Sequence, residues 1–433
     1  MRSVVIGGGA AGFFGAVTAA LAHPAWQVTL LEAGPAPLSK VRISGGGRCN
    51  VTHHCFDPAL LVQHYPRGGK ALRGAFSRFQ PQDTIAWFAE RGVLLKTEAD
   101  GRMFPTTDDS HTIVSCLMQA AQEAGVRVRT RSPVAAVTQT QPALAHPTFT
   151  HPTFAHPTFD VQLKSGERLG CDRVLLATGS SPQGHRIAQS LGHRIEPPVP
   201  SLFTFNIKDA QLHDLKGLSV TPATLKLKLE GIKKPLEQTG PLLITHWGLS
   251  GPAVLKLSAW GARPLHQQRY RATVLVNWLP TLPDTEIRAA LQQIKQVRSR
   301  QALTTHSLFD LPKRLWQYLL HRSDLDPQLT WANLSKKGLN RLVQELTNGT
   351  YAVAGKGVFK DEFVTCGGVR LKDVNFKTME SRRCPGLFFA GEVLDIDGIT
   401  GGFNFQSAWT TGWLAGQSIG TETMASKTAG SIP

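Results

Sequence analysis

Residues 3–33 of the chain read SVVIGGGAAGFFGAVTAALAHPAWQVTLLEA, and this stretch decides the fold. It begins with a short apolar run that favours a buried strand over residues 3–6, and a glycine-rich turn follows. An apolar stretch of helical length over residues 13–21 comes next, and a second strand-like run ends at Glu32. Strand, glycine turn, helix, strand and acidic residue in this order predict an α/β, Rossmann-like unit that binds a dinucleotide.

Three glycines of the turn have the spacing GxGxxG, and each has its own physical reason. Gly7 permits the tight turn, Gly9 lets a pyrophosphate approach the backbone, and Gly12 allows the helix to pack closely on the strand. The helix N-terminus offers unpaired N–H groups to the phosphates. Glu32 can accept hydrogen bonds from ribose hydroxyls and would repel a 2′-phosphate. The neighbours that we assign to the same site are Ala10, Ala11 and Ala33. A glycine-rich turn that binds nothing is the alternative interpretation.

A second element, near the C-terminus, indicates which dinucleotide is bound. Residues 386–404 read GLFFAGEVLDIDGITGGFN, which is an apolar strand, then an acidic, glycine-rich turn and the start of a helix. This element and the strand VLLATGS at 174–180 resemble the corresponding parts of FAD-dependent proteins with two dinucleotide-binding folds. The resemblance implies bound FAD and a domain closed by chain from both termini. The expected cofactor contacts from these parts are Thr178, Gly179, Gly391, Glu392, Asp395, Gly401, Gly402, Phe403 and Asn404, and Val134 is assigned to the same site.

Residues 40–52, KVRISGGGRCNVT, are predicted to form a loop whose backbone can lie against a ligand. Arg48 could neutralise a phosphate, and Asn50 could hydrogen-bond the edge of a ring. Cys49 has three interpretations: a general acid, a charge-transfer thiolate beside a flavin, or a small buried side chain that only packs. The cofactor contacts expected from this loop are Lys40, Ser44, Gly46, Gly47, Arg48, Cys49 and Asn50.

The length and charge of the chain indicate several domains and an anionic partner. A chain of 433 residues exceeds the size of one compact core. Residues 200–280 are strand-rich and residues 284–347 are helical in pattern, so an insertion divides the dinucleotide-binding domain. Residues 200–362 hold 22 Lys and Arg against 12 Asp and Glu, whereas the rest of the chain holds 25 against 19. This excess favours RNA as a partner of the insertion, and a solvated basic surface is the alternative.

Four further features carry smaller predictions. His246, in the polar turn THWGLSGP, is either a proton donor or a core histidine, and Ser250 is expected to cap the helix that follows. HPTF occurs three times within residues 144–159, between two strand-like runs, which favours an expanded hairpin loop over a metal site. The six cysteines lack metal-ligand spacing and indicate reduced thiols in a cytoplasmic protein. The apolar residues 3–22 are explained by the strand, turn and helix, so no membrane partner is expected.

Several motifs occur together and make the chain similar to a known family. They are SGGGRCNVT at 44–52, THWGLSGPAVLKLS at 245–258, VTCGGV at 364–369 and AGEVLDIDGITGGFNFQSAWTTG at 390–412. With the N-terminal GGGAAG, they resemble the BaiN/RdsA family of bacterial flavoproteins, over the whole chain apart from the HPTF repeats and the C-terminal tail. The resemblance implies an FAD domain with an inserted β-barrel and a small helical domain. The predicted boundaries are 1–197 and 358–433 for the FAD domain, 198–283 for the barrel and 284–357 for the helical part.

The resemblance also implies a reaction, the reduction of a C=C bond conjugated to a carbonyl. Family members include a bile-acid enone reductase, an aminoacetone-oxidase-like protein and a ribosomal RNA dihydrouridine synthase. We expect NAD(P)H to reduce the flavin and to dock transiently, because no second GxGxxG appears. Cys49 or His246 is the expected proton donor. The alternatives are an enone reductase or amine oxidase of small molecules, and a flavin-carrying binding protein without turnover. His53 and Phe403 depart from the family pattern, which often has Asn and Tyr there.

Overall fold

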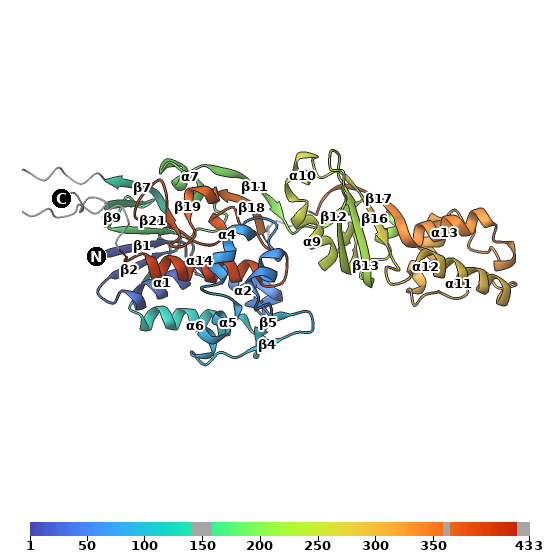
Figure 1. Cartoon of the computed structure of the whole chain (residues 1–433), viewed down its shortest axis with the longest axis horizontal. Coiled ribbons are helices and arrows are strands. Elements are labelled where there is room, and N and C mark those ends of the chain that lie inside the picture. The colour runs from blue at the N-terminus through green and yellow to red at the C-terminus, as the bar shows by residue number, and fades with distance from the viewer. Residues whose placement is uncertain (141–157, 358–363, 422–433) are drawn as a thin grey trace, which may run out of the picture. The chain divides into compact units, whose positions relative to one another are not determined.

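The computed structural model describes residues 1–140, 158–357 and 364–421, and the chain divides into two compact units (Figure 1). The larger unit comprises Met1–Pro198 and Thr365–Pro433, and the smaller unit is Val199–Val364. The larger unit is therefore built from both ends of the chain, as predicted. The three histidines of the HPTF repeats lie outside the described residues.

A seven-stranded sheet forms the centre of the larger unit, in the order β19-β20-β21-β10-β1-β2-β6. Its strands are β1 (Arg2–Ile6), β2 (Gln27–Leu31), β6 (Arg127–Arg129), β10 (Arg173–Leu176), β19 (Val374–Asn375), β20 (Glu380–Ser381) and β21 (Leu387–Phe389). β1 pairs in parallel with β2 on one side and with β10 on the other, and β10 pairs in parallel with β21. These four strands consist almost wholly of buried residues, which is typical of a parallel sheet covered on both faces.

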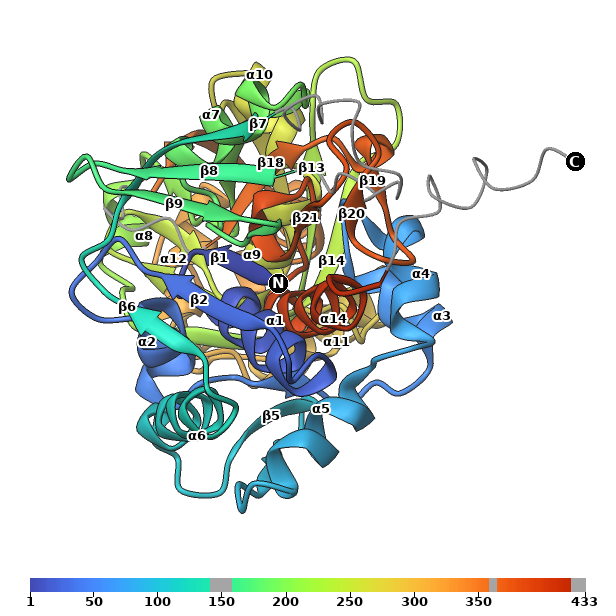
Figure 2. The same ribbon diagram turned by 90° about the vertical axis from the view of Figure 1, so that its left-hand side faces the viewer.

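Two helices from opposite ends of the sequence lie side by side on the sheet (Figure 2). They are α1 (Ala10–Ala22) and α14 (Phe403–Ser418). Glycines let them approach closely. A Cβ on Gly412 would lie 2.6 Å from the carbonyl oxygen of Ala11, and one on Gly416 would lie 2.6 Å from that of Gly15. This backbone-to-backbone contact joins the N-terminal and C-terminal segments into one domain.

Smaller elements complete the larger unit. Its other helices are α2 (Ser39–Gly47), α3 (Pro58–Leu61), α4 (Gly69–Phe76), α5 (Pro81–Ala89), α6 (Ser110–Glu123) and α7 (Pro182–Ser190). Its small sheets comprise β3 (Thr52–His53), β5 (Arg102–Pro105) and β4 (Leu95–Thr97), and β7 (Val134–Thr140), β8 (Thr158–Leu163) and β9 (Arg168–Cys171). β7 and β8 pair antiparallel on the two sides of the HPTF repeats, which confirms the predicted hairpin. A further two-stranded sheet consists of β11 (Ile195–Ser201) and β18 (Val364–Val369).

The smaller unit contains a closed six-stranded barrel in the order β12-β15-β14-β13-β16-β17. Its strands are β12 (Phe205–Ile207), β13 (Ser219–Lys228), β14 (Leu236–Thr245), β15 (Gly248–Ser250), β16 (Ala272–Asn277) and β17 (Gly349–Lys356). Its main helices are α9 (Pro252–Trp260), α10 (Ala262–Gln267), α11 (Asp284–Val297), α12 (Lys313–Arg322) and α13 (Lys336–Asn348), with a short α8 (Ala210–His213). Barrel and helices share one hydrophobic cluster, which includes Trp278 and Trp316.

One strand of the barrel lies in a range for which the prediction was wrong. β17 falls within residues 284–357, which were predicted to be helical, yet it pairs antiparallel with both β16 and β12 and closes the barrel. The reason is the alternation along β17, where Tyr351 and Val353 face the core and Ala352 and Ala354 face outward. The helical segment is therefore inserted between two strands of the barrel. Among the described residues, no helix has both the length and the apolar character needed to cross a membrane.

Candidate functional site

The predicted cofactor residues meet at one edge of the seven-stranded sheet, because parallel strands end together. Gly7 follows β1 and Glu32 follows β2, whereas Thr178 and Gly179 come shortly after β10, and Gly391 and Glu392 shortly after β21. β1 lies between β2 and β10 in the sheet. Helix α1 connects β1 to β2 on one side, whereas β10, on the other side, comes much later in the chain. The strand order therefore reverses at β1, and a crevice at such a reversal is the usual ligand position in open α/β sheets.

The geometry around the glycine turn agrees with the predicted roles of Gly7 and Gly12, and it leaves the space at Gly9 open. Gly7 has a φ of +112°, and a Cβ there would lie 2.4 Å from the carbonyl oxygen of Ala177. A Cβ on Gly12 would lie 1.9 Å from the oxygen of Gly7, so helix and turn are in direct contact. A Cβ on Gly9 would meet nothing within 4 Å. The space above Gly9 is thus open to a ligand that approaches the backbone.

The N-terminus of α1 is suited to bind an anion. Gly9 is its N-cap residue, no side chain caps it, and its first turn contains no acidic residue. Its first N–H groups and the positive end of the helix dipole therefore remain available to a phosphate. Ala10 starts this helix, and Ala11 lies beside Gly391, whose added Cβ would approach the Ala11 methyl group to 2.7 Å. The helix is 13 residues long, and the open backbone at its N-terminus fits the pyrophosphate of FAD.

Glu32 is held by the backbone of two glycines. Its carboxylate accepts hydrogen bonds from the N–H groups of Gly8 at 2.8 Å and Gly34 at 2.6 Å. A carboxylate can accept about four hydrogen bonds, so capacity remains for the ribose hydroxyls of a dinucleotide. The adjacent Ala33 is exposed, and Val134 is buried at the start of β7. The N–H of Ser132 donates to the Glu32 carbonyl oxygen at 2.8 Å, and this bond brings Val134, at the start of β7, close to the end of β2.

Glu392 joins three parts of the sequence that are far apart. Lys40, at the start of α2, donates to its carboxylate at 2.7 Å, and the N–H of Thr365 donates to its other oxygen at 2.9 Å. A Cβ on Gly179 would lie 3.7 Å from the same carboxylate. The sequence predicted Lys40, Gly179 and Glu392 separately and did not reveal that they meet. The side-chain hydroxyl of Thr178 packs against Gly184 of α7.

The loop of residues 44–50 is in part a helical segment. α2 spans Ser39–Gly47, but Ser44, Gly45 and Gly46 have non-helical backbone angles. Gly46 and Gly47 have φ of +71° and +87°, and a Cβ on either would meet nothing within 4 Å. Two successive open glycines in the left-handed region agree with a backbone that can lie against a ligand. The hydroxyl of Ser44 donates to the Val41 carbonyl oxygen within the same turn.

Arg48 and Asn50 have protein partners that the sequence did not reveal, and their contacts with the cofactor stay a prediction. The Arg48 guanidinium donates to Glu98 at 2.6 Å and lies 4.0 Å above the ring of Phe104, so its charge is already neutralised. In the amide orientation that satisfies both partners, Asn50 donates to the Thr52 carbonyl oxygen and accepts from the N–H of Gly402 at 2.9 Å. Asn50 thus ties this loop to the N-cap of α14. In each case, spacing along the sequence could not reveal the distant residue that the side chain contacts.

Cys49 is fully buried, which favours its neutral thiol over a thiolate. Its relative exposure is 0%, and burial raises the pKa of its thiol to about 12, which outweighs the lowering by the nearby Ser44 hydroxyl. The residue has a φ of +62°, which is uncommon for a side chain with a Cβ. At neutral pH the thiol is protonated, so the charge-transfer interpretation has no support in this geometry. A buried neutral thiol leaves packing or proton donation as its function.

Hydrogen bonds hold the turn before α14 in place. Asn404 accepts from the N–H of Gly398 at 2.8 Å and donates to its carbonyl oxygen at 2.9 Å. Asp395 is buried, and its N–H donates to the Val369 carbonyl oxygen. Gly401 and Gly402 have φ of +134° and +91°, and Gly402 is the N-cap of α14. These contacts fix the position of the helix N-terminus that is expected to face the flavin ring.

Aromatic side chains surround Phe403 in a cluster that the sequence did not reveal. The Phe403 ring stacks on His53 with centroids 4.5 Å apart and on His64 with centroids 4.3 Å apart. The hydroxyl of Tyr65 donates to the Phe403 carbonyl oxygen at 2.6 Å. His53 and Phe403, the two departures from the family pattern, are therefore in direct contact with one another. Nearby, Arg67 forms a two-pronged ion pair with the fully buried Asp397.

His246 and Ser250 lie in the smaller unit and differ from their predictions. His246 is exposed in the turn between β14 and β15, where its ring contacts Trp247 with centroids 3.6 Å apart. The interpretation as a core histidine is therefore wrong, since a two-residue hairpin turn leaves the side chain in solvent. Ser250 ends β15, and Gly251 is the N-cap of α9 with no side-chain cap. Gly251 adopts a φ of +92°, which a turn into the helix requires and serine disfavours.

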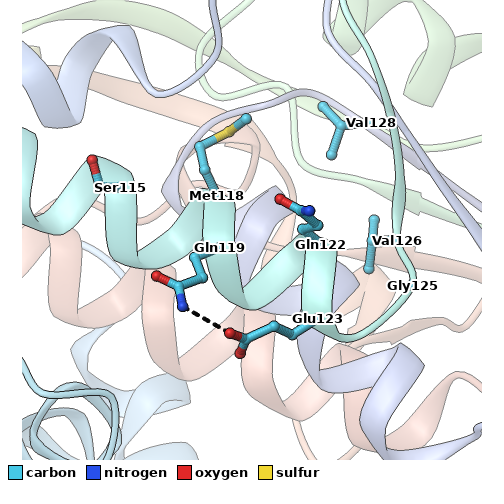
Figure 3. A pocket seen from close by; sticks show the side chains of 8 residues that line it. All are labelled: Ser115, Met118, Gln119, Gln122, Glu123, Gly125, Val126 and Val128. Atoms are coloured by element: carbon cyan, nitrogen blue, oxygen red, sulfur yellow. Dashed lines mark hydrogen bonds between the residues drawn. The ribbon is translucent and has the colours of Figure 1, made fainter.

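A hollow of about 800 Å³ lies elsewhere, on the outer surface of α6 and β6 (Figure 3). Its wall includes Met118, Gln119 and Glu123, and the Gln119 amide donates to the Glu123 carboxylate at 2.8 Å. None of the predicted cofactor residues lines it. The strand ends, with their open glycines and carboxylates, are therefore the candidate site, and this hollow is a surface feature.

Comparisons with known proteins agree with this architecture. Residues 1–418 match the family model described as the HI0933-like protein Rossmann domain. The chain is 29% identical to a ribosomal RNA dihydrouridine synthase of Escherichia coli, over 96% of this chain and 97% of that protein. It is 31% identical to the enzyme of the same name from Haemophilus influenzae, over 96% and 98%. It is 29% identical to a 3-dehydro-bile acid delta(4,6)-reductase of Clostridium scindens, also over 96% and 98%. The chain thus belongs to the HI0933-like family, and its larger unit is a Rossmann-type FAD-binding domain.

Proposed function

We propose that this protein is an FAD-dependent oxidoreductase that uses NAD(P)H to reduce a C=C bond conjugated to a carbonyl, with a uridine of ribosomal RNA as substrate. The observation that carries the proposal is the similarity over 96% of the chain to relatives named for such reductions. Dihydrouridine is uridine whose ring C=C bond has been reduced, and a delta(4,6)-reductase also acts on C=C bonds. The shared chemistry of relatives with different substrates supports the reaction class.

FAD supplies the hydride chemistry when it is bound, and the chain's own residues supply binding and orientation. The open backbone at Gly9 and the N-terminus of α1 fit the pyrophosphate, and Glu32 fits the adenosine ribose. Glu392 and Lys40, an ion pair at the end of β21, fit the ribityl and phosphate region. Gly46 and Gly47 leave an open backbone at the end of α2. Each of these assignments is a proposal that rests on geometry and charge.

The proton that completes the reduction requires a donor. Cys49 remains a proposed donor because burial keeps its thiol protonated, although a thiol with a pKa of about 12 is a weak acid. His246 is the alternative, because its exposed ring can be reached by a large substrate. Cys49→Ala and His246→Gln are expected to differ: only replacement of the true donor lowers the rate of flavin reoxidation by substrate. Equal rates in both variants and the wild type would remove both residues from the role.

RNA is the proposed substrate because of the charge of the insertion. Residues 200–362 hold ten more basic than acidic residues, with 22 Lys and Arg against 12 Asp and Glu. A polyanion gains affinity from such an excess, whereas a neutral small molecule does not. The target base must be unpaired or flipped out, since a flavin ring cannot reach a base inside a stack. An rRNA substrate would also place the enzyme in the cytoplasm.

A small-molecule reductase is the second candidate, favoured by the similarity to the bile acid reductase. Mass spectrometry of rRNA nucleosides from a strain that lacks the gene distinguishes the two. Loss of one dihydrouridine, restored by the wild-type gene and not by a variant that cannot bind FAD, is the expected result. An unchanged dihydrouridine content would refute the rRNA substrate. Stopped-flow reduction of the bound flavin by NADPH and NADH tests the reductant, and no reduction by either would indicate a flavin-carrying protein without turnover.

A further inference from the structure

The outer face of the barrel presents a row of residues from three neighbouring strands. In the antiparallel register, Lys228 of β13 lies opposite Thr273 of β16, and Thr273 lies opposite Ala352 of β17. Their neighbours Leu227, Val274 and Val353 belong to the hydrophobic core of the barrel. Because successive residues of a strand point to opposite faces, this row points away from the core.

A hollow of about 530 Å³ lies over this row. Its floor consists of small side chains, Thr273, Ala352 and Ala354, which leave room for a ligand close to the sheet. Gln268 forms part of its wall and is fixed there, because its amide donates to the Glu230 carbonyl oxygen at 2.9 Å and accepts from the Glu230 N–H at 3.3 Å. The hollow is thus a shaped part of the barrel surface.

Three basic side chains stand around the hollow. Lys208 follows β12, Lys228 ends β13 and Arg271 precedes β16, and all three are exposed. Glu230 is the one acidic residue that lines the hollow. In the part of the chain that the structure describes, none of the three cations has a carboxylate within ion-pairing distance. Elsewhere in the unit, Lys226 pairs with Glu237 at 3.4 Å and Arg322 with Glu345 at 2.6 Å. The hollow therefore keeps an excess of uncompensated positive charge.

The chemistry of the lining indicates a sugar-phosphate backbone. Lysine contacts phosphate as a point charge, and the arginine fork can bind it with two parallel hydrogen bonds. No aromatic residue lines the hollow, so no platform for stacked bases is present among its residues. The cations are exposed and come from separate elements, whereas a site for one small anion would be expected to bury its donors. Many shallow contacts along a chain of phosphates suit this arrangement better.

We propose that this hollow of the barrel, with Lys208, Lys228 and Arg271, binds the phosphate backbone of single-stranded RNA without reading its sequence. The proposal deepens the function proposed above and rests on it for the identity of the polyanion. It assigns to the barrel the holding of the substrate strand, separately from the chemistry at the strand ends of the FAD-binding unit.

The test removes the three cations together, as Lys208→Ala, Lys228→Ala and Arg271→Ala. The matched control removes three others from the same unit, Lys336→Ala, Lys337→Ala and Arg341→Ala on α13. Both variants lose the same charge. None of the control residues lines the hollow: they lie on α13, which precedes β17, whereas the hollow lies beside residues 352–354 in the middle of that strand.

Fluorescence anisotropy of a labelled single-stranded RNA, titrated over a range of KCl concentrations, is the measurement. Each phosphate contact of single-stranded RNA contributes about 0.7 to the slope of log K against log salt concentration. The hollow variant should therefore lower the magnitude of this slope by about 2 if all three contacts are lost. The control should change the slope by much less. Circular dichroism and the visible spectrum of the bound flavin show whether each variant is folded and loaded.

Two results would overturn the proposal. One is an unchanged slope in the hollow variant, and the other is an equal decrease in both variants, which would mean that only total charge matters. Dihydrouridine in rRNA, measured after complementation of the deletion strain, reports separately on the proposed function. If the wild type makes no dihydrouridine while the slope still falls only in the hollow variant, the RNA-binding surface stands and the proposed reaction fails. If the wild type makes dihydrouridine and the slope is unchanged, the reverse holds.

Discussion

Replacement of Gly9 by alanine separates the binding of FAD from the folding of the protein. Gly9 has a φ of −90°, which alanine can adopt, and a Cβ there meets nothing within 4 Å. Alanine reduces the entropy of the unfolded chain, which stabilises by about 0.4–1 kcal/mol. It is also a poorer N-cap than glycine, which costs about as much. We therefore expect the unfolding free energy of the apoprotein to change by less than about 0.5 kcal/mol.

The cost appears when FAD binds, because the new methyl group occupies the space through which the pyrophosphate approaches the backbone. Forcing one extra carbon into a filled contact costs about 1–3 kcal/mol. At 1.4 kcal/mol for each factor of ten, the Kd for FAD should rise by about 5- to 150-fold. Quenching of flavin fluorescence on titration into the apoprotein measures this Kd, and denaturant unfolding of the apoprotein measures its stability.

Gly12→Ala is the matched control, because its Cβ would lie 1.9 Å from the Gly7 carbonyl oxygen. It should destabilise the apoprotein itself, by about 3 kcal/mol or more. An unchanged Kd for FAD in Gly9→Ala would refute the placement of the pyrophosphate at Gly9. A loss of apoprotein stability in Gly9→Ala as large as that in Gly12→Ala would refute the inference that the space above Gly9 is open.

Three further outcomes follow from single contacts. The N–H groups of Gly8 and Gly34 each donate to a different oxygen of the Glu32 carboxylate, and Glu32→Gln leaves only one oxygen for both. The free energy of unfolding in denaturant should therefore fall by about 1–3 kcal/mol, and the affinity for FAD should fall too. Asp397→Asn leaves the charge of Arg67 without its buried counter-ion and should cost about 3 kcal/mol, and an unchanged unfolding midpoint would contradict this. Burial raises the pKa of the Cys49 thiol from 9.0 in the unfolded chain to about 12 in the folded protein. The free energy of unfolding is therefore unaffected by this thiol below pH 9.0 and decreases as the pH rises towards 12, because the unfolded chain loses the proton first. Unfolding measured at pH 8 and 10.5 should show this decrease in the wild type and a smaller one in Cys49→Ala.

The sequence predicted the central fold because local spacing determines it. Strand, glycine turn, helix, strand and acid follow one another within residues 3–33, and each step has its own local reason. β17 was missed because its eight residues directly follow the helical pattern of α13, so the end of that pattern was not recognised. The strand is recognisable afterwards from the alternation of Tyr351 and Val353 with small residues, but only the barrel shows which strands it joins.

The partners of individual side chains could not be predicted from spacing, because they lie 50 residues or more away along the chain. Arg48 was assigned to a phosphate from its place beside three glycines, yet Glu98 and Phe104 hold it. Asn50 was assigned to a ring edge, yet it bonds the backbone before α14. In both cases the residue type suggested a ligand, and the structure adds a protein partner that was not foreseen. Candidate contacts inferred from one loop are therefore weakest where the side chain is long or can bond in several directions.

Three long-range contacts connect residues 40–67 with residues 391–404. Lys40 pairs with Glu392, Arg67 pairs with Asp397, and His53 stacks on Phe403. The first segment contains the glycine loop and the second carries the N-terminus of α14, so both sides of the proposed flavin site are fastened to each other. The family departures at His53 and Phe403 lie in one of these three ties. They are consequently two changes to the same contact: His53→Asn would remove one of the two rings that stack on Phe403, whereas Phe403→Tyr would keep the stacked ring and add a hydroxyl.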